Sequence, residues 1–332
     1  MFPIADWVSS PPDIDVDSVR LVGEFATVIG DQEITGTTLA LLAIHRGRIV
    51  AESYADGTDR DSTLISWSMA KSFTHAIVGI ADGEKLIDLA TGAPISQWQN
   101  DERIAITLQH LLNMRSGLSW VEDYVDGDAS DVIDMLFGSG LADHAAYAVA
   151  QLPVEPPGST WLYSSGTTNI ICRILGDVLG DSDGSNEHMK AFLQHRLFDA
   201  LGMSSATAQF DAAGTFVGSS YVFATARDFA RFGYLYLNDG LWNGRRILPE
   251  GWVDHARTVT AHDDESGFDY GAHWWSLPQE IGSLVAAGYE GQYIMVIPQR
   301  ELILVRLGKT PAEKKKAVVE SLMKIIELFP RR

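Results

Sequence analysis

The chain lacks several features that would have placed it in a compartment or a structural class at once. Only one of its 332 residues, Cys172, is a cysteine, so no disulfide can form within the chain, and its apolar neighbours predict a small buried side chain. No stretch reaches the roughly 18 apolar residues of a membrane-spanning helix, and the N-terminus has no secretory signal pattern. We therefore expect a cytoplasmic protein.

Basic residues are scarce relative to acidic ones. The chain has 25 Lys and Arg against 44 Asp and Glu, a formal net charge of -19. Such a charge repels a phosphate backbone and an anionic membrane surface. We expect neither a nucleic acid nor a membrane as partner, and a composition with 46% hydrophobic residues predicts an ordinary globular core.

Strand patterns gather near the two ends of the chain. Two apolar, β-branched runs joined at Arg46-Gly47 predict a hairpin near the start, and three more short runs lie near the end. A lone hairpin or a three-stranded fragment is not stable unaided, so both groups should meet in one sheet. The predicted strands are 39–45, 48–54, 283–288, 292–297 and 302–307.

Helical patterns dominate the middle of the chain and follow the last strand. Thr310 to Glu313 resembles a capping box with proline at the first helical position, and apolar residues then recur at helical spacing. The internal helices are predicted at 108–114, 130–136, 168–179, 189–201 and 226–237.

These patterns predict an α+β fold, an α/β sandwich whose antiparallel sheet is built from both termini with flanking helices. A mostly helical lobe is inserted between the strands. We expect residues 1–84 and 271–332 to form the sheet lobe, residues 85–270 the helical lobe, and the active site to lie in the cleft between them.

A serine and a lysine open one predicted helix. Ser68 and Lys71 are three residues apart, which places them on the same helix face one turn apart. A serine hydroxyl is a weak nucleophile until a base takes its proton, and a lysine can do so when burial and the positive end of a helix dipole lower its pKa. The pair predicts a nucleophile and its base.

Two loops add to this pair. Tyr163 follows a turn rich in proline and glycine, where a tyrosine could pass a proton to the leaving group if cationic neighbours favoured its phenolate. Gly288 to Gln292 lies at the edge of the late strands, where glycines let the backbone approach a ligand and one N–H could bind an oxyanion, with Ser68 supplying the other.

The order Ser68-Met69-Ala70-Lys71, then Tyr163-Ser164-Ser165, then the late glycine-rich strand resembles the serine β-lactamase and penicillin-binding-protein superfamily, in its class C-like branch. Supporting segments include Leu111 to Leu118, Thr225 to Gly233 and Trp242 to Pro249. The resemblance covers residues 35–310 and implies a β-lactamase/transpeptidase-like fold.

The resemblance also implies roles for single residues. Ser68 is the nucleophile, Lys71 and Tyr163 are the acid/base pair, and the backbone amides of Ser68 and Gln292 form the oxyanion hole. No metal or organic cofactor is expected, and a homodimer stays open. The residues expected to contact the substrate are Ser165, Tyr289, Glu290 and Gly291.

Two departures from the β-lactamase pattern bear on the substrate. Where β-lactamases of this branch carry Tyr-x-Asn and Lys-Thr-Gly, this chain has Tyr163-Ser164-Ser165 and Tyr289-Glu290-Gly291, so the carboxylate-binding lysine is missing. The pattern is similar to the esterase and 6-aminohexanoate-dimer hydrolase (nylon oligomer hydrolase) subfamily. It implies a serine hydrolase that forms an acyl-enzyme on small carboxylic esters or short amides.

Other interpretations remain beside this one. A β-lactamase or D-amino-acid peptidase of the same fold is one alternative, and a sensor that is acylated without turnover is another. A Ser-His-Asp hydrolase is disfavoured because Gly-x-Ser-x-Gly is absent, and His75 is expected to be a packed residue.

Metal sites are disfavoured as well. The histidines at 255, 262 and 273 are too scattered for a metal site, and the acidic stretch from Glu122 to Asp134 lacks calcium-loop spacing, which predicts a solvated surface.

Overall fold

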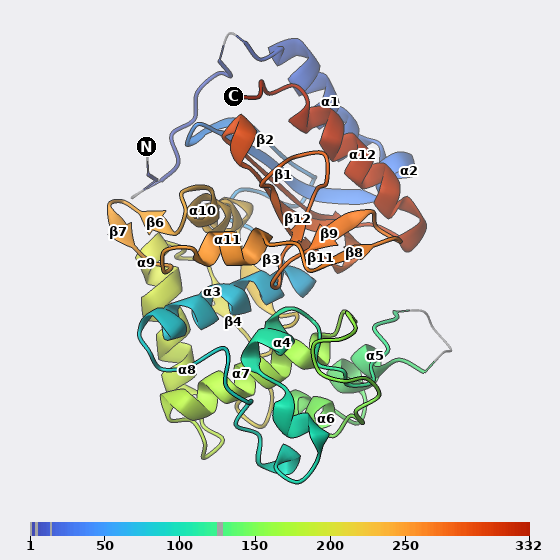
Figure 1. Ribbon diagram of the computed structural model, residues 1–332. Coiled ribbons are helices and arrows are strands. Elements are labelled where there is room, and N and C mark those ends of the chain that lie inside the picture. Colours follow the sequence, from blue (N-terminus) through green and yellow to red (C-terminus); the bar gives the residue numbers. More distant parts are fainter. Residues whose placement is uncertain (1, 4–5, 14, 125–128) are drawn as a thin grey trace.

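The computed structural model describes residues 2–3, 6–13, 15–124 and 129–332. The ribbon divides into a part with the large sheet and a part built mainly of helices, and the C-terminal end of the chain lies beside the sheet (Figure 1). Helix α3 (Ala70–Gly83) runs between the two parts. This is the mixed arrangement that the strand and helix patterns predict.

The large sheet has eight strands in the order β2-β1-β13-β12-β11-β10-β9-β8, and each neighbouring pair is antiparallel. Strand β1, from the N-terminal part, pairs with β13 near the C-terminus, so the sheet is built from both ends of the chain. The five predicted strands are all present. The strand bounds are β1 Thr37–His45, β2 Arg48–Tyr54, β8 Ala261–Asp263, β9 Phe268–Tyr270, β10 Trp275–Ser276, β11 Leu284–Gly288, β12 Gln292–Ile297 and β13 Leu302–Lys309.

The sequence analysis did not predict β8, β9 and β10, which extend the sheet beyond β11. They are two or three residues long, too short for the alternation of apolar and polar residues to register. Strands β8 and β9 lie within the range 85–270 that we had assigned to the helical lobe. Small sheets are formed by β3 (Leu64–Ile65), β5 (Val222–Ala224) and β4 (Thr207–Ala208), and by β6 (Leu241–Trp242) and β7 (Arg245–Arg246).

Each face of the sheet has its own apolar core. Residues such as Leu41 and Leu304 pack with helices α1 (Ser18–Gly30) and α12 (Lys315–Ile326). Residues of the opposite face, such as Leu42 and Val305, pack with α3, α10 (Ala226–Leu237) and the helical part. Apolar side chains that alternate between two covered faces explain why β1 and β13 are buried along most of their length.

Two features of the helices differ from the predictions. Helix α1, with Asp17 as N-cap and Leu21, Phe25 and Val28 on its buried side, is absent from the predicted helices. At the other end, Thr310 does not cap a helix: its hydroxyl donates to the carbonyl of Thr35, and α12 begins at Lys315 after a 3-10 turn, without a side-chain cap.

The remaining helices lie mostly in the helical part. None of the helices in the described part of the chain is long and apolar enough to cross a membrane. They are α2 Gln32–Thr35, α4 Leu108–Leu112, α5 Asp131–Phe137, α6 His144–Val149, α7 Ser165–Leu179, α8 Glu187–Phe192, α9 Asp199–Leu201 and α11 Trp252–Arg257, with a π-helical segment at Leu193–Phe198 between α8 and α9.

Helix α3 is almost entirely buried, which fixes the residues at its start. Phe73 is 0% exposed, and its ring stacks on Phe232 of α10 at a centroid distance of 3.7 Å and an interplanar angle of 12°. Phe198 and Phe229 meet the same ring edge-on. The aromatic cluster therefore holds α3 against the helix that covers the sheet.

Replacing Phe73 by alanine should lower the free energy of unfolding by about 3–5 kcal/mol, because a large cavity would open in a core that cannot collapse around it. Urea denaturation measures the change. Val19→Ala is the control, since Val19 is 85% exposed and its truncation should change stability by less than about 0.5 kcal/mol. A loss below about 1 kcal/mol for Phe73→Ala would contradict this account of α3.

Candidate active site

Ser68 lies in a tight turn directly before α3. The 3-10 turn Trp67–Met69 joins the helix, and Trp67 has a φ of 45°, a conformation that is unfavourable for a bulky side chain. Ser66 anchors the turn, because its N–H donates to the carbonyl of Val222 at 2.8 Å and its hydroxyl accepts from the Val222 N–H at 3.0 Å. Strain of this kind persists only where the surroundings hold it, which is common at functional sites.

Lys71 lies next to the Ser68 hydroxyl. The Lys71 Nζ donates to Ser68 Oγ at 3.0 Å, to Ser165 Oγ at 2.9 Å and to the carbonyl oxygen of Ser219 at 3.1 Å. The lysine is 2% exposed, so these three acceptors replace its water shell. The predicted pair is thus brought together in the geometry that its spacing implied.

The Lys71 environment lowers the pKa of its amine. Burial lowers this pKa from 10.5 to about 8, while the negative charge of Glu122, with Oε1 at 3.9 Å from Nζ, opposes the shift. The neutral amine is therefore accessible near neutral pH. A lysine in this state can accept a proton from a neighbouring hydroxyl.

Glu122 was not predicted to belong to the site. Its carboxylate accepts from the Ser165 N–H at 2.8 Å, from the Ser165 hydroxyl at 2.5 Å and from Trp120 Nε1 at 2.6 Å. Its side chain is only 12% exposed, so the expectation of a solvated acidic surface was wrong at this residue. Glu122 stands among other acidic residues, so nothing in the sequence distinguished it from an exposed carboxylate. Two of these neighbours, Asp126 and Asp128, lie outside the described residues.

Tyr163 lies beside Ser68 and Lys71. Lys71 Nζ lies 4.8 Å from the centre of its ring. Burial and the negative charge of Glu122 raise the pKa of Tyr163 above its ordinary value, and these two effects outweigh the opposing influence of the Ser68 hydroxyl. The phenol is therefore neutral in the free protein, and the phenolate that the sequence analysis considered is disfavoured.

Ser165 lies inside this network and is 0% exposed. Its hydroxyl accepts from Lys71 and donates to Glu122, so one hydroxyl links the ammonium to the carboxylate. The sequence analysis listed it among residues that contact substrate. Its position supports a different contribution, the orientation of the Lys71 amine.

Trp67, Tyr124 and Tyr289 form an aromatic wall beside the turn that carries Ser68, and Glu290 lies next to it. The Tyr289 ring stacks on Tyr124 at 4.5 Å and meets the Trp67 ring at 5.7 Å and an angle of 87°. Trp67 Nε1 donates to Glu290 Oε2 at 3.4 Å. Tyr289 and Glu290 are therefore in contact with the residue that precedes Ser68.

The predicted oxyanion donor, the Gln292 amide, lies at the start of β12. This strand runs between β11 and β13, so its amides point toward neighbouring strands. The Gln292 side chain bridges to Gly308, accepting from its N–H at 2.9 Å. By contrast, β10 pairs with β11 only at Val285, which makes the Tyr289 amide, farther along that edge, a second candidate donor.

Gly288 shows how closely this strand approaches the nucleophile turn. A Cβ atom at Gly288 would lie 2.4 Å from the carbonyl oxygen of Ser66. Only glycine allows the two backbones to meet at this distance. The glycines here were predicted to let the backbone approach a ligand; at Gly288 the close neighbour is another segment of the chain.

Trp275 and Tyr270 complete the aromatic surroundings of Tyr163. Their rings lie 5.3 and 5.9 Å from that of Tyr163. Trp275 begins β10 and is partly exposed, whereas Trp274 directly before it is 0% exposed.

His75 has a packing role, as predicted. Its Nδ1 lies 2.8 Å from the Tyr236 hydroxyl and its Nε2 lies 3.1 Å from His255 Nδ1, and burial lowers its pKa. His273 Nδ1 contacts the Leu112 carbonyl at 2.8 Å. Among the described residues, no three potential ligands cluster as a metal site would require.

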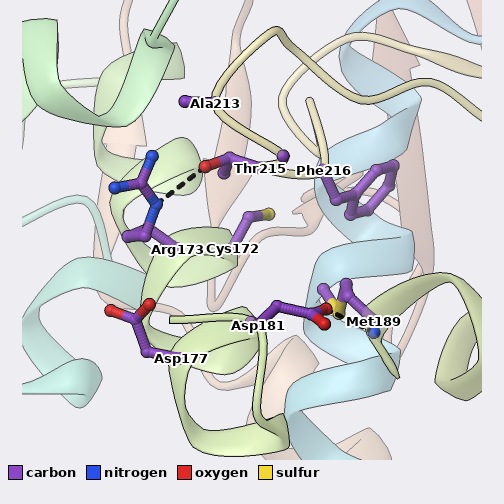
Figure 2. A pocket seen from close by; sticks show the side chains of 10 residues that line it. Cys172, Arg173, Asp177, Asp181, Met189, Ala213, Thr215 and Phe216 are labelled. Carbon is purple, nitrogen blue, oxygen red and sulfur yellow. Dashed lines mark hydrogen bonds between the residues drawn. The ribbon is translucent and has the colours of Figure 1, made fainter. Parts of the chain in front are cut away.

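A small cavity lies elsewhere in the helical part, beside α7. Figure 2 shows Cys172, Arg173 and Thr215 on its wall, with Arg173 Nε donating to Thr215 Oγ1 at 2.8 Å. Its volume of about 10 Å³ is close to the minimum for one water molecule. Cys172 is buried, as expected, and burial raises the pKa of its thiol to about 12.

The chain is similar in sequence to known hydrolases over most of its length. The sequence pattern of the β-lactamase family matches residues 27–322. The chain is 26% identical to the 6-aminohexanoate-dimer hydrolase of Paenarthrobacter ureafaciens, an alignment that covers 94% of this chain and 83% of that protein.

Two solved structures show the same fold. A family VIII carboxylesterase superposes with a TM-score of 0.69 at 14% identity, covering 96% of this chain and 98% of the other. A class C β-lactamase from Rhodobacter sphaeroides superposes with a TM-score of 0.67 at 17% identity, covering 92% and 99%. The fold class predicted from the sequence is confirmed.

The contact between Glu122 and Lys71 predicts a pH effect. Glu122→Gln removes the charge that raises the pKa of Lys71, so this pKa should fall further below 8. A base must be neutral to act, so the acidic limb of the pH profile of kcat/KM for ester hydrolysis should move to lower pH.

Glu155→Gln, which neutralises an exposed carboxylate, is the matched control and should leave the profile in place. An acidic limb that stays put in Glu122→Gln, or moves to higher pH, would contradict the electrostatic role of Glu122.

Proposed function

Because the chain belongs to the β-lactamase family, we propose that it is a serine hydrolase that forms an acyl-enzyme on Ser68 and cleaves carboxylic esters or short amides. The observation that carries the proposal is the 3.0 Å contact between Ser68 Oγ and the buried Lys71 Nζ, whose pKa is lowered to about 8. A buried amine with this pKa, touching a serine hydroxyl, meets the two requirements for activating the serine as a nucleophile.

Acylation would begin with transfer of the Ser68 proton to neutral Lys71. The freed Oγ attacks the carbonyl carbon of the substrate, and backbone amides near Ser68 stabilise the oxygen that becomes negative. As the intermediate collapses, the bond to the alcohol or amine breaks and this leaving group takes a proton from Tyr163. The Lys71 ammonium restores the proton of Tyr163.

Deacylation would reverse these proton movements. A water molecule gives its proton to neutral Lys71 and attacks the acyl carbon, and Ser68 Oγ leaves and is reprotonated. A neutral phenol at the start of the cycle suits Tyr163 to donate a proton rather than to accept one, in keeping with its raised pKa. Lys71 is therefore the base in this proposal, and Tyr163 is the proton donor.

The preference for esters and short amides rests on the surroundings of Ser68. Tyr289 stands where β-lactamases of this branch carry the lysine that binds the substrate carboxylate, and the Glu290 carboxylate beside it would repel an anionic group. The aromatic wall of Trp67, Tyr124 and Tyr289 favours an apolar substituent. The relative from Paenarthrobacter ureafaciens, named for an amide substrate, adds support.

A β-lactam is the second candidate substrate, because class C β-lactamase shares the fold. The missing lysine argues against it. Hydrolysis of nitrocefin faster than that of p-nitrophenyl butyrate would reverse this ranking.

Ser68→Ala and Lys71→Ala should each reduce kcat/KM for p-nitrophenyl butyrate by about 10³-fold or more, because each removes a part without which the other is inactive. Hydrolysis is followed continuously with enzyme far below substrate, so that multiple turnovers exclude an acylated sensor. Lys190→Ala, which removes an exposed lysine, is the control. Activity that survives in Ser68→Ala would overturn the proposal.

Tyr163→Phe should lower kcat for a p-nitroanilide by about 10²–10⁴-fold, because the proton donor to the leaving group is lost. The protein should stay folded, since only a hydroxyl is removed. The loss should be greater for a p-nitroanilide than for the p-nitrophenyl ester of the same acid, because an amine leaving group needs a proton and p-nitrophenolate does not. Equal losses for the two substrates would assign proton delivery to another group.

A further inference from the structure

Arg306 is a fully buried cation that the proposed chemistry does not use. It is 0% exposed on β13, and its Nη1 donates to the carbonyl oxygens of Glu290 at 3.0 Å and Gly291 at 2.8 Å. The other donors bind the chain before and within β1: Nε reaches Thr38 Oγ1 at 3.1 Å, and Nη2 reaches the same hydroxyl at 3.0 Å and the carbonyls of Thr35 and Thr37, both at 3.2 Å. Every acceptor is neutral.

No carboxylate among the described residues lies within ion-pair distance of the Arg306 guanidinium, although other arginines in that part of the chain, such as Arg227 and Arg300, pair with carboxylates. Burial lowers the pKa of Arg306 to about 10, so the side chain remains charged at neutral pH. Burying a charge without a counter-ion is unfavourable unless hydrogen bonds satisfy it. An arginine here therefore needs a reason beyond filling space.

The turn that follows β11 is shaped around this guanidinium. Glu290 and Gly291 have φ values of 59° and 79°, and a Cβ at Gly291 would lie 2.6 Å from Arg306 Nη1. On β13 itself, a Cβ at Gly308 would lie 2.6 Å from the guanidinium carbon. Glycines at both places therefore leave room for the guanidinium beside the turn.

This segment also contacts the two residues that precede Ser68. Gly288 meets the Ser66 carbonyl, the Tyr289 ring meets Trp67, and Trp67 Nε1 donates to Glu290. The turn therefore lies between the Arg306 guanidinium and the residues that precede Ser68. A displacement of its backbone would change where its amide groups lie relative to Ser68.

We propose that Arg306 is a positioning residue for the oxyanion site, holding the carbonyls of Glu290 and Gly291 so that the amide of Tyr289, at the start of the same turn, keeps a fixed place beside Ser68. The two carbonyls belong to the residues that directly follow Tyr289, so the guanidinium fixes the backbone on which this amide depends. Arginine suits this task because its planar fork stays protonated and binds two carbonyls at once. The inference rests on the proposed acyl-enzyme chemistry.

A structural brace without effect on the reaction is the competing explanation, and the chain offers a matched control for it. Arg300 is also buried, at 7% exposure, in the turn between β12 and β13. It pairs with Glu280 at 2.8 Å and donates to the Phe329 carbonyl. Arg300 therefore braces the opposite end of β13, and its replacement should destabilise the protein without reaching Ser68.

The experiment compares Arg306→Met, Arg306→Lys and Arg300→Met with the full-length wild type. Tm is measured first, and assays run well below the lowest value. kcat and KM for p-nitrophenyl butyrate are then determined, together with the inhibition constants of two competitive inhibitors. Propylboronic acid forms a tetrahedral adduct with Ser68 Oγ and so depends on the oxyanion site, whereas butyrate remains planar.

Arg306→Met should lower kcat by about 10–100-fold with KM changed less than about threefold, because a displaced amide weakens the transition state more than the bound ester. Its inhibition constant for propylboronic acid should rise in the same proportion, and that for butyrate should not. Arg306→Lys, which keeps the charge but loses the fork, should recover part of kcat. Arg300→Met should lower Tm and leave kcat and both inhibition constants unchanged.

Equal effects of Arg306→Met and Arg300→Met on kcat, or equal weakening of both inhibitors, would overturn the positioning role. If Arg306→Met does not fold, Arg306→Lys is compared with Arg300→Lys instead. The same two comparisons then decide: the change in kcat between the two variants, and the change in the inhibition constant of propylboronic acid relative to that of butyrate. A wild type whose turnover does not depend on Ser68 would refute the proposed function itself, which separates the two failures.

Discussion

The site depends on the burial of one amine. An ammonium at the position of Lys71, 2% exposed, loses almost all of its hydration, and this loss makes the neutral form accessible near pH 8. The fold must therefore satisfy the charged form well enough to remain stable, yet not so well that the proton is never released. Three neutral oxygens in contact and one carboxylate at 3.9 Å meet both conditions. Glu122 at closer range would hold the proton on the amine more firmly.

Much of the surrounding architecture follows from this burial. Lys71 can be dry only if α3 is covered on all sides, and the aromatic contacts of Phe73 with α10 supply part of that cover. The Ser219 carbonyl, which accepts from Lys71, comes from the chain that leads into β5. Ser66 ties the turn before the helix to the first residue of β5, Val222. The same small strand thus supports both members of the Ser68 and Lys71 pair.

Structural features that depend on the spacing of nearby residues could be predicted from the sequence. A serine and a lysine three residues apart need only one helical turn to meet, and β1 and β11–β13 are short apolar runs bounded by turn residues, so these features were predicted correctly. Glu122 and Arg306 meet their partners across 43 and 268 residues of chain, respectively. A carboxylate in an acidic stretch and an arginine in an apolar strand give no sign of such contacts. The phenolate first considered for Tyr163 failed for the same reason, because the burial that raises its pKa comes from distant strands.

Lys71 and Arg306 show two different uses of a buried cation in this fold. Lysine can lose its proton when desolvated, and its compact ammonium lies against a hydroxyl that needs a base. Arginine remains protonated even where burial lowers its pKa to about 10, and its fork spans neighbouring carbonyls. The residues could not exchange places: an arginine next to Ser68 would never accept a proton, and a lysine under the turn could not bind the carbonyls with the same geometry. A lysine therefore suits the position where a proton must be transferred, and an arginine suits the position where the backbone must be held in place.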